Sequence, residues 1–499
     1  MRVRGRVMNT IYPDDSWALH TDLYQINMMK TYWELGKADT HAVFESYFRS
    51  NPFNSGYAVF AGLERIVNYI QKLKFTQSDI DYLRSLNTYP EEFLDYLKDF
   101  KFKGTIRSMV EGEVVFAGEP LIQVEGPLAD CQLVETAILN VLNYQTLIAT
   151  KASNIKSIVK DEPVLEFGTR RAQEMDAAIW GTRAAFIGGC DATSNTRAGK
   201  IFNIPVSGTH AHSLVQVYRN DYDAFIAYAT THKDCVFLVD TYDTLKSGVP
   251  NAIRVARELG EKINFLGVRI DSGDMAYISK KVRQQLDDAG FTEAKIYASN
   301  DLDEKTILNL KMQGARIDVW GVGTKLITAY DQPALGAVYK LVSIEDEQGN
   351  MVDTLKLSSN AEKVSTPGKK QVWRITKNDD GKSEGDYITL WEERPDQKEE
   401  LFMFHPVHTY INKTVTNFSA RPLLKEIFVD GKLVYDLPKL TEIKTYAEVS
   451  LGMLWEEYKR SLNPEAYPVD LSQSAYHHKI KSIEKARDDV NKLSKKPII

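Results

Sequence analysis

The clearest strand in the sequence is Phe265-Leu266-Gly267-Val268-Arg269-Ile270-Asp271, which runs directly into the polar residues Ser272-Gly273-Asp274. Similar apolar runs recur every ~25–40 residues, the length of one strand-plus-helix unit. Helical patterns such as residues 252–259 lie between the runs. The other runs cover residues 164–167, 204–207, 236–240, 295–299 and 318–322.

Strands of this kind, apolar throughout, are buried on both faces and need parallel neighbours with covering helices. Six such units predict an α/β fold with a (β/α) barrel or a barrel-like sheet. An open doubly wound sheet is the alternative that the pattern leaves open.

Changes in sequence texture on either side of this zone predict three parts. Residues 1–148 mix strands and helices and include a small glycine-containing β module at 104–126, which indicates an α+β domain. Residues 149–341 are expected to form the barrel domain and to carry the active site. Residues 342–499 carry turn signals between strand-like runs and end in a helical, charged tail.

The composition is that of a soluble globular protein. The chain has 499 residues, is 43% hydrophobic and 26% charged, and has a net charge of 62 − 68 = −6, which argues against general nucleic-acid binding. The sequence has no apolar run long enough to span a membrane. The opening residues 1–6 lack a secretory apolar segment. Three scattered cysteines, Cys131, Cys190 and Cys235, predict no disulfide framework or zinc site, so we expect a cytoplasmic protein.

Polar residues follow every strand of the barrel zone. They are Gly168-Thr169-Arg170-Arg171, Gly208-Thr209-His210-Ala211-His212-Ser213, Thr241-Tyr242-Asp243, Ser272-Gly273-Asp274, Asn300-Asp301 and Gly323-Thr324-Lys325. Any one of them could be an ordinary turn. Six in succession favour one shared ligand site, because the carboxyl ends of parallel strands meet at one edge.

Two of these loops are candidates for phosphate binding through free backbone N–H groups. Gly321-Val322-Gly323-Thr324 is the better candidate and Ser272-Gly273 the weaker one. The sequence has no Walker A motif, so any nucleotide must be bound without a P-loop. His210 and His212 leave three roles open: metal ligation, structural hydrogen bonding, or acid–base and nucleophilic chemistry.

The ordered set of motifs resembles nicotinate phosphoribosyltransferases over nearly the whole chain. The matching stretches are Ala18–Gln25, Phe44–Arg49, Glu166–Gln173, Gly208–Ser213, Gly267–Asp274, Val322–Thr324, Lys356–Ser359 and Tyr467–Ser472.

The resemblance implies a fold and an activity. The fold is that of a type II phosphoribosyltransferase, an irregular barrel plus an α+β domain built from both chain ends, so the C-terminal part is expected to pack on the N-terminal domain. The implied reaction makes nicotinate mononucleotide from nicotinate and phosphoribosyl pyrophosphate, coupled to ATP hydrolysis, and supplies NAD synthesis. Mg²⁺ is the expected cofactor, with unknown ligands, and a homodimer with shared active sites is expected.

The resemblance also implies roles for individual residues. Tyr24, contributed by the neighbouring subunit, and Phe167 would clamp the pyridine ring, although both could be core aromatics. Arg269 would pair with the substrate carboxylate, with Thr209 beside it.

The remaining roles concern the phosphate-bearing substrates. Arg170, Gly323 and Thr324 would contact phosphoribosyl pyrophosphate. Asp271 would hold a hydroxyl or Mg²⁺, and His212 would be phosphorylated by ATP.

Three other functions compete with this one. A related transferase could prefer nicotinamide or quinolinate, and a non-catalytic barrel could simply bind a phosphorylated metabolite.

Overall fold

The computed structural model describes residues 16–358 and 364–494. The opening residues 1–6 and Ser359, which entered the sequence analysis, lie outside these ranges. Within them, no helix combines the length and apolar character needed to cross a bilayer.

The predicted barrel strands form one six-stranded sheet in which all strand pairs are parallel. The spatial order is β7-β6-β11-β10-β9-β8. Read as a circle, this is simple chain order with an opening between β7 and β8, which is the order of a barrel and not of a doubly wound sheet. The strands are β6 (Val164–Glu166), β7 (Ala192–Thr193), β8 (Asp234–Leu238), β9 (Asn264–Ile270), β10 (Lys295–Ala298) and β11 (Val319–Val322).

One predicted strand is wrong. Residues 204–207 make only an isolated parallel bridge, between Val206 and Thr193, and the strand at this place is the two-residue β7. Pro205 has no N–H to donate to a sheet, and Asn203 before it is left-handed, with φ of 54°. A two-residue strand is too short for the hydrophobic pattern to indicate it.

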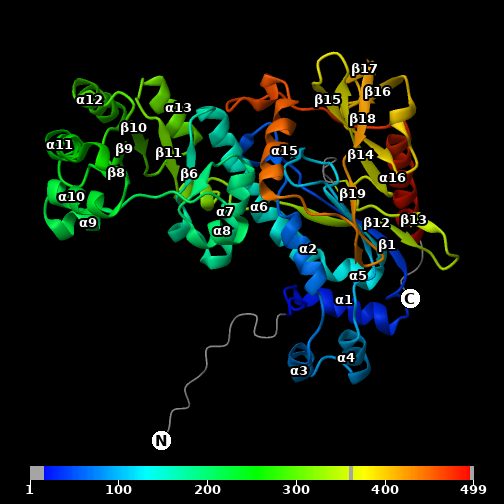
Figure 1. Cartoon of the computed structure of the whole chain (residues 1–499). Coiled ribbons are helices and arrows are strands. Elements are labelled where there is room, and N and C mark those ends of the chain that lie inside the picture. The colour runs from blue at the N-terminus through cyan, green and yellow to red at the C-terminus, as the bar shows by residue number, and fades with distance from the viewer. Residues whose placement is uncertain (1–15, 359–363, 495–499) are drawn as a thin grey trace, which may run out of the picture.

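Helices cover the outside of the barrel sheet, and the predicted helix at 252–259 lies within α11. In Figure 1, α10, α11 and α12 flank β8 and β9 on the side away from the rest of the molecule. The barrel helices are α7 (Glu174–Ile187), α8 (Thr196–Phe202), α9 (His212–Tyr218), α10 (Asp221–Thr231), α11 (Val249–Leu259), α12 (Met275–Asp288), α13 (Glu304–Met312) and α14 (Thr324–Ile327).

Gly267 shapes strand β9 just before the predicted site residues. Its φ is +150°, and a Cβ there would lie 1.9 Å from the carbonyl oxygen of Lys295. The register of β8 against β9 shifts beside it. Only glycine allows this close approach of β9 to β10, two residues before Arg269.

The second part of the molecule is built from both chain ends, as predicted. Its seven-stranded antiparallel sheet has the order β13-β12-β1-β5-β3-β19-β20. These strands are β1 (His41–Tyr47), β3 (Thr105–Ser108), β5 (Ile122–Pro127), β12 (Val338–Glu345), β13 (Met351–Asp353), β19 (Lys425–Val429) and β20 (Lys432–Leu433). The fold class, an irregular barrel with a domain from both ends, is therefore confirmed.

Two smaller sheets and the remaining helices complete this part. One sheet contains β14 (Lys370–Lys377), β15 (Ser383–Leu390), β16 (Glu400–Phe404), β17 (Asn412–Thr416), β18 (Phe418–Pro422) and β21 (Val469–Leu471); the other pairs β2 (Ala58–Val59) with β4 (Val114–Val115). The helices are α1 (Leu23–Glu34), α2 (Leu63–Lys72), α3 (Gln77–Ser85), α4 (Glu91–Lys98), α5 (Leu128–Leu133), α6 (Glu135–Val159), α15 (Leu440–Gly452) and α16 (Gln473–Ser494).

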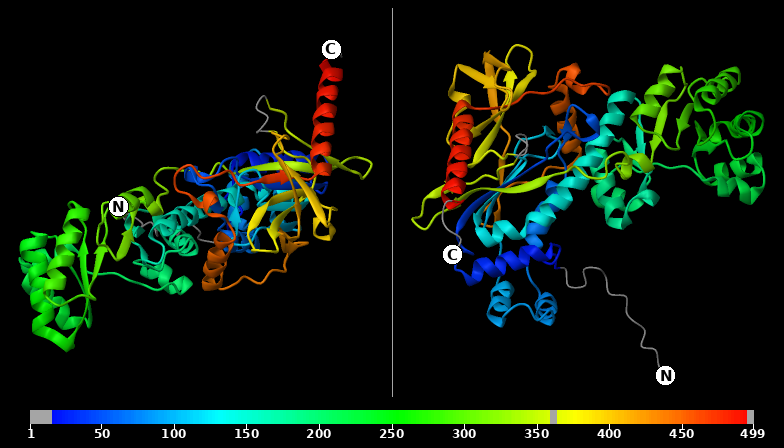
Figure 2. Two further views of the ribbon diagram at one scale, coloured as in Figure 1. Left: turned by 90° about the horizontal axis from the view of Figure 1, so that it is seen from above. Right: turned by 180° about the vertical axis from the view of Figure 1, so that it is seen from behind.

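Helix α6 joins the two parts, and Figure 2 shows it running between them. Helix α6 spans the predicted domain boundary at 148/149, and strand β12 spans the predicted boundary at 341/342. The exact domain boundaries therefore stay a prediction. Ion pairs connect the N-terminal and C-terminal portions of this second part. The fully buried Arg374 pairs with Glu113 and with Asp386 at 2.7 Å each. Removing one partner from such a buried cluster leaves a buried charge unpaired and is strongly destabilising.

Candidate functional site

Phe167 lies where β6 and β11 end side by side. Its N–H donates to the carbonyl of Val322 at 2.8 Å. A Cβ on Gly321 would lie 2.7 Å from the Phe167 ring, and one on Gly323 would lie 3.1 Å from the Phe167 carbonyl oxygen. The predicted residues Phe167, Gly323 and Thr324, the first residue of α14, are thus brought together.

A series of neighbouring residues runs from Phe167 across the strand ends. The same Cβ on Gly321 would lie 3.3 Å from the Cβ of Ser299. Ser299, which follows β10, donates its hydroxyl to Asp271. Asp271 Oδ2 lies 3.7 Å from His212 Nε2. Phe167 and His212 therefore stand at opposite ends of one edge, with Asp271 between them.

Arg269 lies on β9, two residues before Asp271 and therefore on the same face of the strand. Its Nη2 donates to the carbonyl of His210 at 3.0 Å. Its Nε is buried and has no hydrogen-bond partner among the described residues. Burial lowers the pKa of Arg269, and the carboxylates of Asp271 and Asp240 oppose that shift. Arg269 is thus a largely buried cation with an unused donor.

Arg170 lies in the loop after β6, and Thr209 lies between α8 and α9. Arg170 lies in the 3₁₀ turn η2 (Thr169–Arg171), is exposed, and is close enough to act on the charge of Arg269. Thr209 is partly buried, and its hydroxyl donates to the carbonyl of His210 at 3.3 Å.

His212 is held between a hydroxyl and two carboxylates. Its Nδ1 lies 3.0 Å from the Thr241 hydroxyl. Its Nε2 lies 3.7 Å from Asp271 Oδ2 and 4.0 Å from Asp240 Oδ1, and its side chain is 38% exposed. One edge of the sheet therefore brings together four of the predicted residues: Phe167, Arg269, Asp271 and His212.

Asp240 was missed as a site residue by the sequence analysis. Its Oδ2 accepts the N–H of Asp271 at 2.9 Å and also the Ser272 hydroxyl. Its Oδ1 is buried and has no hydrogen-bond partner within the described ranges. The sequence does contain a signal for Asp240. It ends an apolar run, as Asp271 ends the next apolar run along the chain.

His210 takes the structural role among the three left open. Its Nε2 accepts the N–H of Leu238 at 3.2 Å, and its ring packs 5.0 Å from that of Tyr228. Burial lowers its pKa to about 4. The imidazole is therefore neutral at pH 7 and serves to hold the loop before His212.

This burial makes stability depend on pH. The folded pKa of His210 is about 4 against an ordinary 6.5, so between these values the unfolded chain binds a proton that the folded chain does not. The free energy of unfolding should fall as pH falls through this window, by up to about 1.4 kcal/mol per pH unit from this one group.

His210→Gln, which can still accept the N–H of Leu238, should reduce the slope of the unfolding free energy against pH, measured by urea unfolding from pH 6.5 down to 4.5. His232→Gln, at an exposed histidine, should retain the slope; equal slopes in all three proteins would contradict the assignment.

Tyr24 is not brought to Phe167 within one chain. It lies on α1, is 48% exposed, and interacts with Thr136 and Glu135. In Figure 1, α1 lies with α3 and α4, away from β8–β11. Its placement by a neighbouring subunit stays a prediction.

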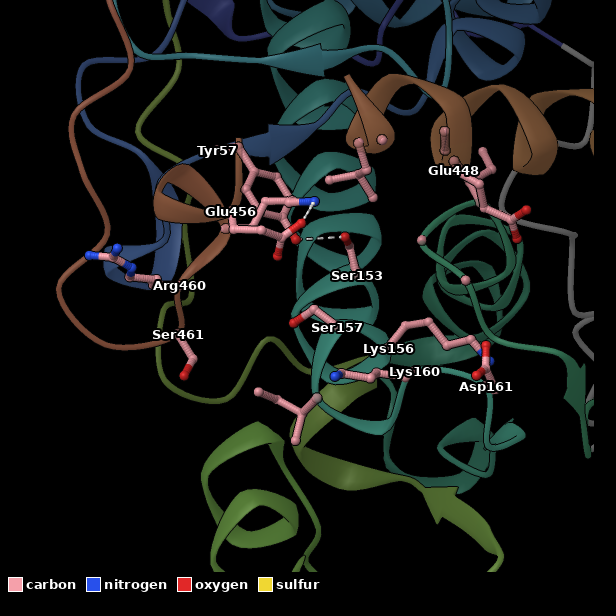
Figure 3. Close-up of a pocket in the computed structure, with 18 of the residues that line it drawn as sticks. Tyr57, Ser153, Lys156, Ser157, Lys160, Asp161, Glu448, Glu456, Arg460 and Ser461 are labelled. Carbon is pink, nitrogen blue, oxygen red and sulfur yellow. Dashed lines mark hydrogen bonds and ion pairs between the residues drawn. The ribbon is translucent and has the colours of Figure 1, made fainter. Parts of the chain in front are cut away.

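A cavity of about 1120 Å³ lies elsewhere, between α6, α15 and residues 456–462. Figure 3 shows Lys156 of α6, Lys160 just after that helix, and Glu448 of α15 along its walls. Asp191, also in its lining, accepts the N–H of Val164 at the start of β6. The cavity is thus next to the amino end of β6, the end that in barrels serves stability and not chemistry. None of the predicted site residues lines it.

The described residues contain no group of three or more His, Cys, Asp or Glu side chains that could hold a metal ion. At the strand ends, Asp240 and Asp271 supply two carboxylates. A metal held there would need its other ligands from substrate or water.

The sequence matches family models along most of its length. Residues 19–143, 163–372 and 369–479 match the nicotinate phosphoribosyltransferase N-terminal domain, family and C-terminal domain. The chain is 61% identical to nicotinate phosphoribosyltransferase of Bacillus subtilis (strain 168), over 96% of this chain and 98% of that protein.

Solved structures share the fold of this chain. The crystal structure of human nicotinic acid phosphoribosyltransferase matches with a TM-score of 0.82 at 29% identity, covering 92% of this chain and 99% of that one. A nicotinate-nucleotide pyrophosphorylase from Pyrococcus furiosus shares the fold, with a TM-score of 0.68 at 24% identity and coverage of 90% and 99%.

Proposed function

The chain belongs to the nicotinate phosphoribosyltransferase family, and from this premise we propose that it transfers the phosphoribosyl group of phosphoribosyl pyrophosphate to nicotinate. The products are nicotinate mononucleotide and pyrophosphate, in the first step of NAD synthesis from nicotinate. We further propose that ATP hydrolysis drives the transfer through a phosphohistidine at His212. The observation that carries the proposal is the series of neighbouring residues from Phe167 through Ser299 and Asp271 to His212, with Arg269 on the strand that leads to Asp271.

Nicotinate is a planar aromatic acid, and the strand ends offer complementary groups. The ring of Phe167 can stack on the pyridine, and Tyr24 of the partner subunit is proposed to cover the other face. The free Nε of Arg269 can donate to the carboxylate, with Thr209 as a further polar contact. Arg170, Gly323 and Thr324 are assigned to phosphoribosyl pyrophosphate, through the guanidinium and the backbone N–H groups.

In the transfer, the pyridine nitrogen attacks C1 of the ribose while the bond from C1 to pyrophosphate breaks. The nitrogen already has a lone pair, so no general base is required. Positive charge develops on the ribose and negative charge on the leaving oxygens, where cationic side chains stabilise it. Asp271 is proposed to accept a hydrogen bond from a ribose hydroxyl.

The surroundings of His212 suit phosphoryl transfer from ATP. An imidazole nitrogen would form the N–P bond while the γ-phosphorus bond to the ADP oxygen breaks. Thr241 orients the ring through Nδ1. Phosphorylation adds negative charge beside Asp240 and Asp271, so the two states of the enzyme can differ in their affinity for substrates and products.

Asp240 and Asp271 fit Mg²⁺, which binds one or two carboxylates together with phosphate oxygens and water. The fit rests on Asp240 Oδ1, a buried carboxylate oxygen with no hydrogen-bond partner among the described residues. When bound, the ion would supply Lewis-acid stabilisation of the phosphate charge.

We also propose a cytoplasmic homodimer with active sites shared between subunits. Its support is the position of Tyr24, exposed on α1 and remote from Phe167 of the same chain. A nicotinamide-preferring enzyme is not favoured, because Arg269 with its unused donor suits a carboxylate better than an amide.

The test is an assay of the purified protein with phosphoribosyl pyrophosphate, Mg²⁺ and each of nicotinate, nicotinamide and quinolinate, with and without ATP. Formation of nicotinate mononucleotide, faster with ATP and fastest on nicotinate, is the expected result. Absence of product with any pyridine, despite binding of phosphoribosyl pyrophosphate, would instead identify a non-catalytic binding protein.

A further inference from the structure

Glu166 is a buried carboxyl group that the proposed mechanism does not use. It is the last residue of β6 and is 1% exposed. Burial raises its pKa, while hydrogen bonds from Thr193, Gly168 and Thr182 favour the charged form. A carboxyl group is costly to bury unless hydrogen bonds compensate it, so its partners are informative.

The first partner is the loop that carries Phe167. The backbone N–H of Gly168 donates to Glu166 Oε1. Gly168 has no free space around it, because a Cβ would lie 2.6 Å from Ile327 and 2.9 Å from Glu166 Oε1. The bond therefore fixes the turn between Phe167 and Arg170.

The second partner is β7, through Thr193. Its hydroxyl donates to Glu166 Oε2 at 2.6 Å. The backbone of Thr193 in turn accepts the N–H of Ser207 at 2.9 Å and donates to the carbonyl of Pro205 at 3.0 Å. Residues 205–207 lead directly into Thr209 and His212, so one carboxyl group links the Phe167 loop to the His212 segment.

The link matters because β7 is the weak edge of the barrel. It has two residues and borders the opening between β7 and β8. Few sheet hydrogen bonds can hold so short a strand. The third partner is Thr182 of α7. Its hydroxyl lies 2.9 Å from Glu166 Oε2 and 2.8 Å from the carbonyl of Ala178, so Glu166 shares this donor with the helix backbone.

We infer that Glu166 is a positioning residue, which through Gly168 and Thr193 holds the Phe167 loop and the segment 205–212 in register across the strand ends. The inference rests on the proposed function only for its catalytic consequence, since these two segments are assigned to nicotinate and to the phosphohistidine. Its structural content, that both segments depend on one carboxyl group, can be tested without any assay of turnover.

The experiment compares Thr193→Val, Thr193→Ser and Thr182→Val in the full chain. Valine at 193 removes the hydroxyl at nearly constant size, and serine restores it. Hydrogen–deuterium exchange should become faster in both 167–171 and 205–212 for Thr193→Val, and return to the wild-type rate for Thr193→Ser. Thr182→Val, which leaves the Gly168 and Thr193 bonds in place, should affect α7 instead.

In the enzyme assay, Thr193→Val should raise the KM for nicotinate and lower the phosphorylated fraction of the enzyme at fixed ATP, each by about two- to tenfold. The variant loses both bonds of the hydroxyl, the one it donates to Glu166 and the one it accepts from the N–H of Asn195. A change of exchange confined to β7, a lack of rescue by serine, or an equal fall in kcat for both valine variants with KM unchanged would overturn the inference. A wild-type protein that makes no nicotinate mononucleotide would instead refute the proposed function and leave the exchange result to decide the role of Glu166.

Discussion

Arg269→Ala should raise the KM for nicotinate by about 10- to 150-fold, because it removes a charge-assisted contact of roughly 1.5–3 kcal/mol. The side chain is largely buried, and its Nε has no partner among the described residues, so the guanidinium has a donor left for a ligand. Steady-state kinetics with nicotinate varied at saturating phosphoribosyl pyrophosphate and ATP measures the effect.

Two controls bear on this result. Arg269→Lys keeps the charge but loses the planar fork, so it should recover only part of the affinity. Arg254→Ala removes an exposed arginine of α11 that pairs with Glu258 and should leave the KM unchanged. Wild-type affinity for nicotinate in Arg269→Ala would reject the assignment.

The second large effect is expected from His212→Ala. The variant should take up no labelled phosphate from ATP and should keep a slow transfer that ATP no longer accelerates. The reason is that His212 is the imidazole placed between Thr241 and the carboxylates of Asp240 and Asp271. Acid-free gel analysis of the labelled protein and product formation with and without ATP are the two measurements.

His232→Ala is the matched control, since His232 is an exposed histidine of the same barrel, stacked on Tyr228. It should retain both phosphorylation and the ATP effect. Labelled phosphate on His212→Ala would show that the nucleophile is another residue.

Much of the site follows from the strand pattern of the sequence. Phe167, Arg269, Asp271 and Thr324 each lie at or just beyond the carboxyl end of an apolar run. Parallel strands place these ends at one edge, so residues more than a hundred positions apart become neighbours. That rule needs only the local pattern and the topology, and it predicts a shared site at this edge. The roles of Phe167, Arg269 and Asp271 within that site came from the family resemblance.

The residues that were missed are those whose importance depends on partners. Asp240 ends an apolar run, but its importance shows only when its Oδ1 is found buried, without a hydrogen-bond partner among the described residues and 4.0 Å from His212 Nε2. Glu166 looks like part of a strand until its carboxyl group is seen to join a turn, a helix and an edge strand. The predicted strand at 204–207 failed because Pro205 has no N–H to donate and Asn203 is left-handed, so that only Val206 pairs, with Thr193 of β7.

The alternation of apolar strands with helices, and the polar residues that follow each strand, are local features. They suffice to predict a parallel sheet and the edge on which its chemistry lies, while the strand order of the folded chain decides for a barrel. The difference between two histidines only two positions apart is not local. His210 is neutral and structural because its ring is buried against Tyr228 and accepts from Leu238. His212 is partly exposed between two carboxylates brought from other strands. Burial and electrostatic surroundings arise from contacts between distant segments, so they emerge only when the chain is folded.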